Sequence, residues 1–232
     1  MMFYRMIEDF LDDGMFSVAG FSGLPGIYCD ICGQIWGNSN SRLRMEYPDG
    51  YFGYRRQKPI SLDEFNDLKK QIMDDLGGEW LIQDIEPGVD VGFLSLESAS
   101  GRSCDFTMPA SNAIVVSQRF ISFLMKSFVT GWKAHPVIIN GSISNDFYEI
   151  EIIGNAGLAL CDPPIEILYM CNGCGRKTYS DYGKPPTVNN NLWDGSDISK
   201  FDGVFGGYII ISEKLGSLLK SESFEGFKLD KL

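Results

Sequence analysis

The sequence predicts an α+β fold in which short strands and helices are mixed along the chain. Three observations lead to this prediction: a segment with clear helical spacing at 61–78, a strand–helix pattern that occurs twice, at 113–133 and 208–228, and a period-two segment at 145–154. The elements neither alternate strictly nor separate into two blocks, which favours the α+β class.

The chain length suits one large domain or two small ones. With 232 residues, 44% of them hydrophobic, the chain can bury a sizeable core. We expect a single α+β domain over 1–232, with sub-lobes 1–100 and 101–232 as a further division.

The N-terminal segment favours an amphipathic helix over residues 1–16, because Phe3, Ile7, Phe10 and Leu11 fall on one side. After a connection rich in Gly and Pro, the turn residues around 48–50 predict a hairpin within 42–58.

The clearest helix is predicted over 61–78. Ser61 and Glu64 have the spacing of a capping box, apolar residues follow at helical intervals, and Gly77-Gly78 ends the segment. Strand-like pieces follow at 80–85 and 91–96.

The segments AIVVSQRFISFLMKSFVTGWK at 113–133 and YIIISEKLGSLLKSESFEGFK at 208–228 align without a gap. Each predicts a strand, a serine N-cap (Ser117 or Ser212), an amphipathic helix and a glycine stop. The match indicates an internal duplication, but two ordinary strand–helix units would produce much of it through the same local rules. Both interpretations stay open. Between the copies, 145–154 predicts a strand and 180–197 a polar loop.

The composition is acidic, with 31 Asp and Glu against 20 Lys and Arg and a net charge of −11. Such a surface repels a phosphate backbone unless a basic patch is set aside for it, and it is suited to a basic protein partner. Many soluble proteins are acidic for no more specific reason.

Neither a signal peptide nor a membrane span is apparent. Arg5, Glu8 and Asp9 fall where a signal peptide needs an apolar core, and no run of about 18 apolar residues occurs. We therefore expect a cytoplasmic protein, in which paired cysteines are more often metal ligands or redox groups than disulfides.

Two cysteine pairs carry the strongest chemical signal. The segments YCDICG at 28–33 and YMCNGCG at 169–175 each hold two cysteines separated by two residues and followed by glycine. The glycine permits a tight turn that brings backbone N–H groups toward the sulfurs. Four thiolates complete a tetrahedral structural zinc site, so the sequence predicts a zinc-ribbon-like site that joins N- and C-terminal parts. Its ligands would be Cys29, Cys32, Cys171 and Cys174.

Other interpretations of these cysteines stay open: two separate redox pairs, two disulfides, or a remnant that binds no metal. Catalytic zinc is less expected, because four thiolates leave no position for water. Cys104 and Cys161 are expected to be free and buried.

The sequence gives no positive case for catalysis, and we do not expect an enzyme. His135 is the one histidine and lies in no recognisable constellation. Nucleotide-binding and metalloprotease motifs are absent from the sequence. Asp194, Asp197 and Asp202 are expected to be exposed loop acids rather than a cation site.

A basic island accompanies the predicted hairpin. It could contact nucleic acid, although packing of the side-chain stems and pairing with acids is the more economical interpretation. Its members are Arg42, Arg44, Arg55, Arg56 and Lys58.

The two motifs together resemble the double-CXXCG motif immunity proteins, which occur beside polymorphic toxins in bacteria. YCDICG, CNGCG and the segment from Trp193 onward carry the likeness. The resemblance implies a cytoplasmic, non-enzymatic protein that binds and neutralises a cognate protein toxin, with metal on the four cysteines. It implies no toxin-contacting residues.

Three functions are therefore considered. The first is the immunity protein, whose toxin would be basic if charge complementarity applies. The alternatives are a zinc-containing nucleic-acid-binding protein that uses 42–58, and a dithiol redox protein. The acidic charge makes nucleic acid the less expected partner.

Overall fold

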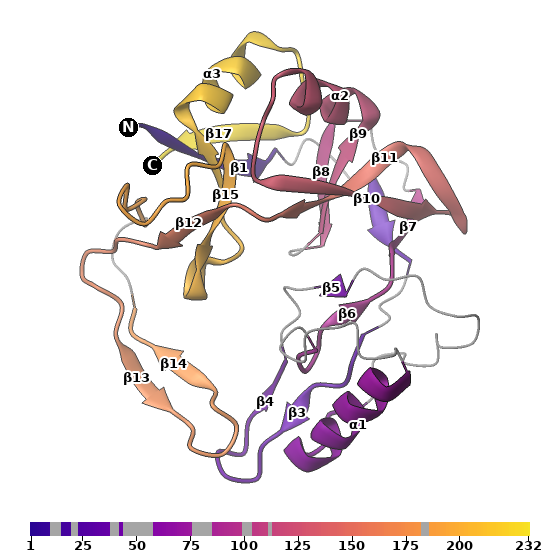
Figure 1. Ribbon diagram of the computed structural model, residues 1–232, viewed down its shortest axis with the longest axis vertical. Helices are drawn as coiled ribbons and strands as arrows, with labels where there is room; N and C mark the ends of the chain where they lie inside the picture. Colours follow the sequence, from indigo (N-terminus) through magenta and orange to yellow (C-terminus); the bar gives the residue numbers. More distant parts are fainter. Residues whose placement is uncertain are drawn as a thin grey trace. The chain divides into compact units, whose positions relative to one another are not determined.

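The computed structural model is rich in β-sheet (Figure 1). In the part of the chain that it describes there are seventeen strands and three α-helices, so the predicted mixture is present but sheets dominate. No helix there is long and apolar enough to cross a membrane. The described residues are 1–9, 15–19, 23–37, 42–43, 58–75, 85–98, 104–110, 113–181 and 186–232.

The chain forms two compact units that are interleaved along the sequence. Unit 1 comprises Met1–Gly20, Leu94–Pro164 and Tyr182–Leu232, and unit 2 comprises Phe21–Phe93 and Ile165–Asp181. Each unit thus takes segments from both sides of residue 100, where the sequence analysis places a division between sub-lobes.

Unit 1 contains two mixed sheets. The first has the strand order β12-β15-β16-β1-β17. Its strands are β12 (Asn155–Leu158), β15 (Ile198–Asp202), β16 (Ile209–Ser212), β1 (Phe3–Glu8) and β17 (Phe227–Lys231). The second has the order β2-β7-β10-β11-β9-β8. Its strands are β2 (Phe16–Val18), β7 (Leu94–Ser98), β10 (Trp132–Ile139), β11 (Ser142–Ile152), β9 (Ala113–Ser117) and β8 (Phe106–Ala110).

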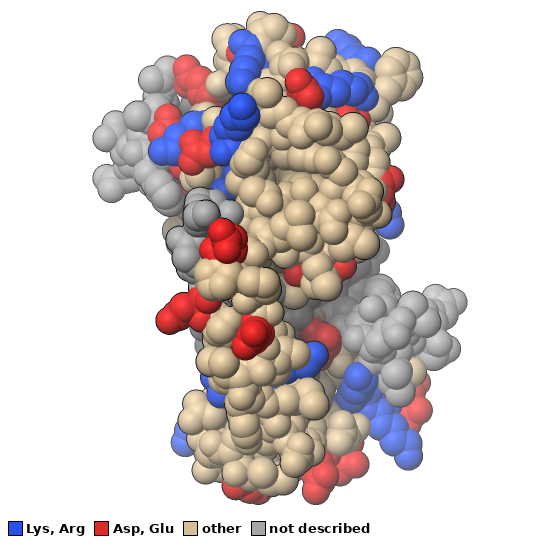
Figure 2. Space-filling view, turned by 90° about the vertical axis from the view of Figure 1, so that its left-hand side faces the viewer, with Lys and Arg blue, Asp and Glu red and all other residues tan. Residues whose placement is uncertain are grey.

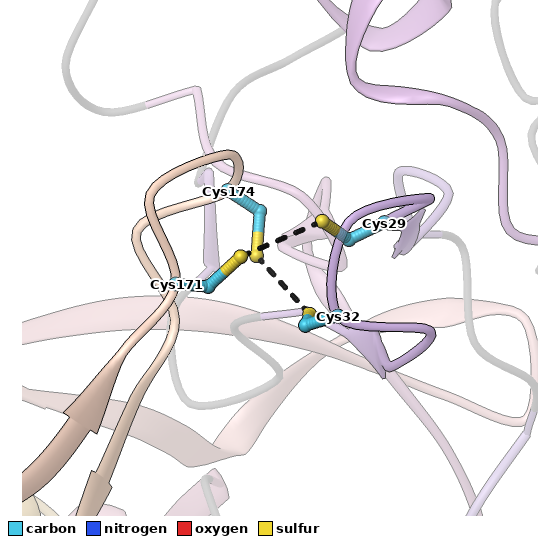
Figure 3. Close-up of side chains that lie close together, drawn as sticks. All are labelled: Cys29, Cys32, Cys171 and Cys174. Atoms are coloured by element: carbon cyan, nitrogen blue, oxygen red, sulfur yellow. Dashed lines mark hydrogen bonds between the residues drawn. The ribbon is translucent and has the colours of Figure 1, made fainter.

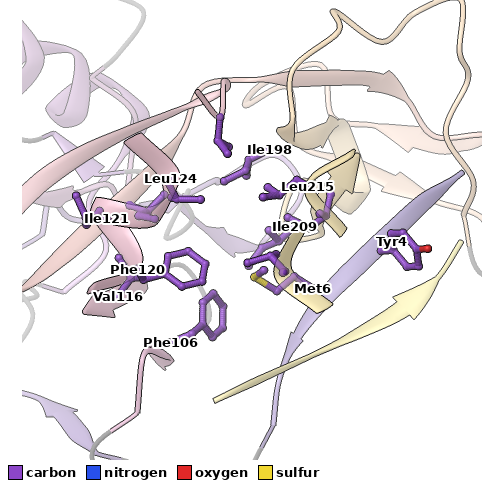
Figure 4. Packing of buried hydrophobic residues seen from close by; sticks show 14 residues of the cluster. Tyr4, Met6, Phe106, Val116, Phe120, Ile121, Leu124, Ile198, Ile209 and Leu215 are labelled. Atoms are coloured by element: carbon purple, nitrogen blue, oxygen red, sulfur yellow. The ribbon is translucent and has the colours of Figure 1, made fainter. Parts of the chain in front are cut away.

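One apolar cluster joins the two sheets of unit 1 through helices α2 (Gln118–Lys126) and α3 (Glu213–Ser221) (Figure 4). Phe120 and Leu124 of α2 and Leu215 of α3 are almost fully buried, together with side chains from strands of both sheets. A second cluster packs against β7, β9 and β10. Burial of this apolar area is the main stabilising contribution to unit 1.

The strand–helix segments at 113–133 and 208–228 fold alike, as predicted. The Oγ of Ser117 accepts a hydrogen bond from the N–H of Phe120 at 3.1 Å, and the Oγ of Ser212 accepts one from the N–H of Leu215 at 3.2 Å. These bonds satisfy free donors at the first turn of α2 and of α3. After each helix a glycine with φ near 91° or 100° leads into β10 or β17.

The likeness extends beyond the aligned segments. The strand order β8-β9-β11-β10 in one sheet matches β15-β16-β1-β17 in the other. Ser117 lies opposite Phe147 of β11, and Ser212 lies opposite Phe3 of β1. The N-terminal strand β1 therefore occupies the position in its sheet that β11 occupies in the other.

A buried aspartate anchors each of these strand–helix segments. The carboxylate of Asp105, just before β8, accepts hydrogen bonds from the Oγ of Ser117 at 2.7 Å, the Nε of Arg119 at 3.1 Å and the N–H of Glu225 at 3.2 Å. Glu225 lies between α3 and β17. This aspartate therefore holds the other repeat's segment as well as its own.

Asp197, just before β15, has the corresponding contacts. Its carboxylate accepts hydrogen bonds from the Oγ of Ser212 and the Nζ of Lys214, both at 2.9 Å, and from the N–H of Thr130 at 3.2 Å. Asp197 is only 5% exposed. The expectation of an exposed loop acid is therefore wrong for this residue, although Asp194 and Asp202 are exposed.

The helix predicted over 1–16 is also wrong in the described part of that segment. Residues 3–8 form β1, which is hydrogen-bonded between β16 and β17 and buries Phe3, Tyr4 and Met6. Pairing on both edges and burial against the core outweigh the weak local helical pattern.

Unit 2 contains the predicted helix as α1 (Leu62–Asp75). The capping box is confirmed, because the N–H of Ser61 donates to Glu64 Oε2 at 2.8 Å and the N–H of Glu64 donates to Ser61 Oγ at 3.2 Å. The helix packs on a small cluster of six buried residues: Leu24, Ile27, Phe65, Ile72, Ile85 and Val89.

Short two-stranded sheets complete unit 2. They are β3 (Ile27–Tyr28) with β4 (Ile35–Trp36), β5 (Arg42–Leu43) with β6 (Asp90–Val91), and β13 (Ile167–Met170) with β14 (Lys177–Tyr179).

Some of the predicted segments are described only in part. Most of the predicted hairpin at 42–58, and the strand at 80–85 except Ile85, lie outside the described residues. The predicted strand at 91–96 is divided between β6 and β7, the predicted strand at 145–154 lies largely in β11, and the described part of 180–197 is a loop.

Candidate metal centre

The first cysteine pair lies at the tip of the β3–β4 hairpin. The N–H of Cys29 donates to the carbonyl of Gln34 at 3.0 Å, and the N–H of Gly33 donates to the carbonyl of Cys29 at 2.8 Å. Gly33 has φ 65°, which a residue with a side chain adopts only at a cost. The glycine after the second cysteine is therefore required by the turn.

The second pair has the same geometry at the tip of the β13–β14 hairpin. The N–H of Cys171 donates to the carbonyl of Arg176 and the N–H of Gly175 to the carbonyl of Cys171, both at 2.9 Å. Gly175 has φ 72°. The repeated cysteine–glycine motif thus encodes two copies of one turn.

The two turns meet, although Cys29 and Cys171 are 142 positions apart (Figure 3). The Sγ atoms of Cys29 and Cys171 are 3.8 Å apart, those of Cys32 and Cys174 are 3.9 Å apart, and all four lie within 4.8 Å of one another. A tetrahedral ion with metal–sulfur bonds of about 2.3 Å spaces its sulfurs by about 3.8 Å. The four cysteines predicted from the sequence therefore lie together and could hold a metal ion.

Apolar packing also joins the two turns. The side chain of Ile31 lies against Gly173, where an added Cβ would come within 2.5 Å of Ile31 Cδ1. Cys29 and Cys171 are buried, while Cys32 and Cys174 are partly exposed. Two of the four sulfur-bearing side chains are thus partly accessible to solvent.

Backbone N–H groups favour negative charge on two of the sulfurs. Those of Cys174 and Gly173 lower the pKa of Cys171 to about 6, and the N–H of Cys32 is the main cause of a lowered pKa at Cys29. The N–H of Gln34 lowers the pKa of Cys32, but burial and the three neighbouring cysteines outweigh it and raise this pKa to about 11. A divalent cation among the sulfurs would offset burial and the repulsion between neighbouring thiolates, so that all four cysteines could be deprotonated together.

Tyr169 is a residue near the cluster that the sequence analysis does not single out. Its hydroxyl is hydrogen-bonded to Cys171, and this contact raises the pKa of the tyrosine. In the sequence, Tyr169 could be noticed because it stands two residues before Cys171. Its contact with Cys171 could not be predicted, because the hairpin brings the two side chains together.

The remaining cysteines belong to unit 1, outside the cluster. Cys104 and Cys161 are free and half-buried. Burial raises the pKa of both thiols, and the thiol of Cys104 donates to the carbonyl of Phe106 at 3.0 Å. Neither thiol is activated, in line with a packing role.

His135 lies on β10 and its Nε2 is 2.8 Å from Glu151 Oε2 on the neighbouring strand β11. This is a cross-strand pair of the kind that stabilises sheets.

The basic island is only partly described. Arg42 is nearly buried and its Nη2 pairs with Asp90 Oδ2 at 3.2 Å, and Lys58 is exposed. Arg44, Arg55 and Arg56 lie outside the described residues. Arg42 is therefore engaged within the protein and does not form part of an open basic surface.

A scan against protein-family models found no match, and neither did a search of curated proteins.

Proposed function

We propose that this protein is a cytoplasmic immunity protein that binds and neutralises a cognate bacterial toxin, and that its four cysteines hold a structural zinc ion. The observation that carries the proposal is the meeting of two identical cysteine turns in one cluster. The same pair of motifs carries the resemblance to the double-CXXCG immunity proteins.

Zinc is the metal that the donor set favours. Four thiolates select soft or borderline ions, and the sulfur spacing suits a tetrahedral ion with zinc–sulfur bonds of about 2.3 Å. With all four positions filled by protein, no site is left for water or substrate. The ion then acts as a staple between Cys29-Cys32 and Cys171-Cys174.

Metal analysis tests the zinc assignment. The chain, purified without a histidine tag from zinc-replete cells, should contain one zinc per molecule, and Cys171→Ser should abolish stoichiometric binding. The matched control Cys161→Ser should retain it. Less than about a tenth of an equivalent in the parent protein would exclude the assignment, because structural sites bind zinc tightly.

Co-expression tests the immunity function. The protein is expressed with the product of the adjacent gene, and the mixture is analysed by size-exclusion chromatography. We expect a stable stoichiometric complex, and rescue of growth in cells that produce that toxin. Separate elution without protection of the host would contradict the proposal and leave the metal site standing.

A dithiol redox protein is the second candidate, and the low pKa of Cys171 favours it. Zinc would silence this chemistry by holding the thiolates. Disulfide reductase activity, assayed with zinc bound and again after a chelator has removed it, would support the redox function, and thiols that are inert in both forms would exclude it.

A further inference from the structure

Strand β13 exposes an unbroken apolar surface. The exposed fractions of Ile167, Leu168, Tyr169 and Met170 are 54, 66, 48 and 53%. The strand carries no charge, and Figure 2, which faces the side of the chain with β13 and β14, shows broad areas without charged side chains. Alternating side chains of a strand point to opposite faces, so β13 is exposed on both.

The outer edge of β13 pairs with no strand in the described residues. The sheet has two strands, and no other strand in the described residues pairs with either of them. An isolated two-stranded hairpin is only marginally stable in water. An exposed, uncharged, apolar edge is a template for another strand, which proteins usually block with charge or proline.

The charges that flank the hairpin are arranged with opposite signs at its two ends. Glu166 and Asp181 lie at the open end, and Arg176 and Lys177 lie at the cysteine end. None of the four forms an ion pair within the described part of the chain. An antiparallel copy of the same hairpin would bring the acidic end of each against the basic end of the other.

We infer that β13 pairs with β13 of a second copy of this chain, antiparallel, about a two-fold axis at which the two Leu168 residues lie directly opposite one another. The product is a four-stranded sheet in the order β14-β13-β13-β14. Glu166 of one copy then lies opposite Met170 of the other, and Lys177 of that second copy lies one strand further on the same face, because Met170 pairs with Lys177 within each hairpin. The exposed edge of β14 carries Lys177, which disfavours an open chain of hairpins and leaves a closed dimer.

Sedimentation velocity of the zinc-loaded full chain tests the pairing. We expect a dimer that dissociates on dilution. A protein that stays monomeric up to about 100 μM, a concentration that would detect even weak specific association, overturns the inference.

Leu168→Lys places two like charges beside the two-fold axis and should raise the dissociation constant of the dimer by at least about tenfold. Ile143→Lys is the matched control, because Ile143 is 63% exposed and lies on β11 of unit 1. It should leave the dimer unchanged. Both variants should keep their zinc and their melting temperature, which shows that the fold is intact. A dimer that survives Leu168→Lys overturns the inference.

A charge exchange gives the second test. Glu166→Lys and Lys177→Glu should each weaken the dimer, and the double variant should recover most of the loss, since it restores opposite signs across the axis. Absence of recovery contradicts the antiparallel register.

The inference does not depend on the toxin. If the protein is monomeric and Leu168→Lys abolishes toxin binding, β13 is a toxin-docking strand and self-pairing is wrong.

Discussion

The two units differ in the interactions that are available to stabilise them. Among the described residues, the larger cluster of unit 1 buries fourteen residues between two sheets and two helices, whereas the apolar cluster of unit 2 has six. Unit 2 instead joins its two chain segments through four cysteines. From this contrast we expect that unit 1 depends mainly on apolar burial, and that a metal ion on the four cysteines would contribute much of the stability of unit 2.

Removal of the proposed zinc ion should therefore have the largest effect, and only in unit 2. We expect Cys171→Ser, or a strong chelator, to destabilise unit 2 by more than about 5 kcal/mol, because the binding free energy of a structural zinc is largely folding free energy. Hydrogen exchange should show loss of protection in α1 and β13–β14 with protection retained in α2 and α3.

Cys104→Ser is the matched control for this experiment, since it removes a half-buried thiol from unit 1 and no ligand. It should leave α1 protected. If Cys171→Ser melts like the parent protein, the cysteines do not stabilise unit 2.

Unit 1 should be most sensitive at its buried aspartates. Asp197→Ala leaves the N–H of Thr130, the Oγ of Ser212 and the charge of Lys214 without their acceptor. We expect a loss of about 3 to 5 kcal/mol in the free energy of unfolding of unit 1, as measured by urea denaturation. Asp202→Ala, at an exposed position, should cost less than about 0.5 kcal/mol. Equal effects of the two variants would show that Asp197 is not an anchor.

Local signals predicted the elements that are locally determined. The capping box at Ser61 and the serine caps at Ser117 and Ser212 satisfy donors within three residues, so the sequence was sufficient for them. The cysteine turns could be predicted for the same reason, because Gly33 and Gly175 require positive φ.

Long-range pairing explains what was missed. The N-terminal strand has a helical pattern, but the segment FYRMIE at 3–8 resembles FYEIEI at 147–152, its counterpart in the other sheet. The same applies to Asp105 and Asp197, which precede their strands without any local sign of burial. Their partners Glu225 and Thr130 are 120 and 67 positions away. Comparison of the repeats as whole sheets, rather than as strand–helix units, would have found these residues.

Acidic pH should lower the stability of unit 1 relative to that of unit 2, and this effect should be smaller than those of the substitutions above. Burial raises the pKa of Asp105 and of Asp197, but hydrogen bonds from Arg119 and Ser117 to the first, and from Lys214 and Ser212 to the second, outweigh it and lower both. A lowered folded-state pKa stabilises the protein above the unfolded pKa of about 3.9, and this contribution is lost as the pH falls through the folded-state value.

Unit 1 should therefore lose stability below about pH 4, and urea denaturation monitored on unit 1 at pH 5 and pH 3 measures the loss. Asp197→Asn should flatten this pH dependence because it removes one of the two titrating groups. An unchanged slope in that variant would assign the effect to other carboxylates.

The smallest expected changes in stability are at the helix caps, where one helix of each unit can be compared directly. Ser61→Ala in unit 2 and Ser117→Ala in unit 1 each remove a side-chain acceptor at a helix N-terminus. Loss of a cap alone costs about 1 kcal/mol. Ser117 also donates to the buried Asp105, so its replacement should cost more than that of Ser61, whose cap is exposed. The free energy of unfolding of each unit, taken from hydrogen exchange, measures both losses. If Ser61→Ala lowers the free energy of unfolding as much as Ser117→Ala does, then α1 stabilises unit 2 more than its small apolar cluster suggests. Unit 2 would then depend less on a bound metal than we predict.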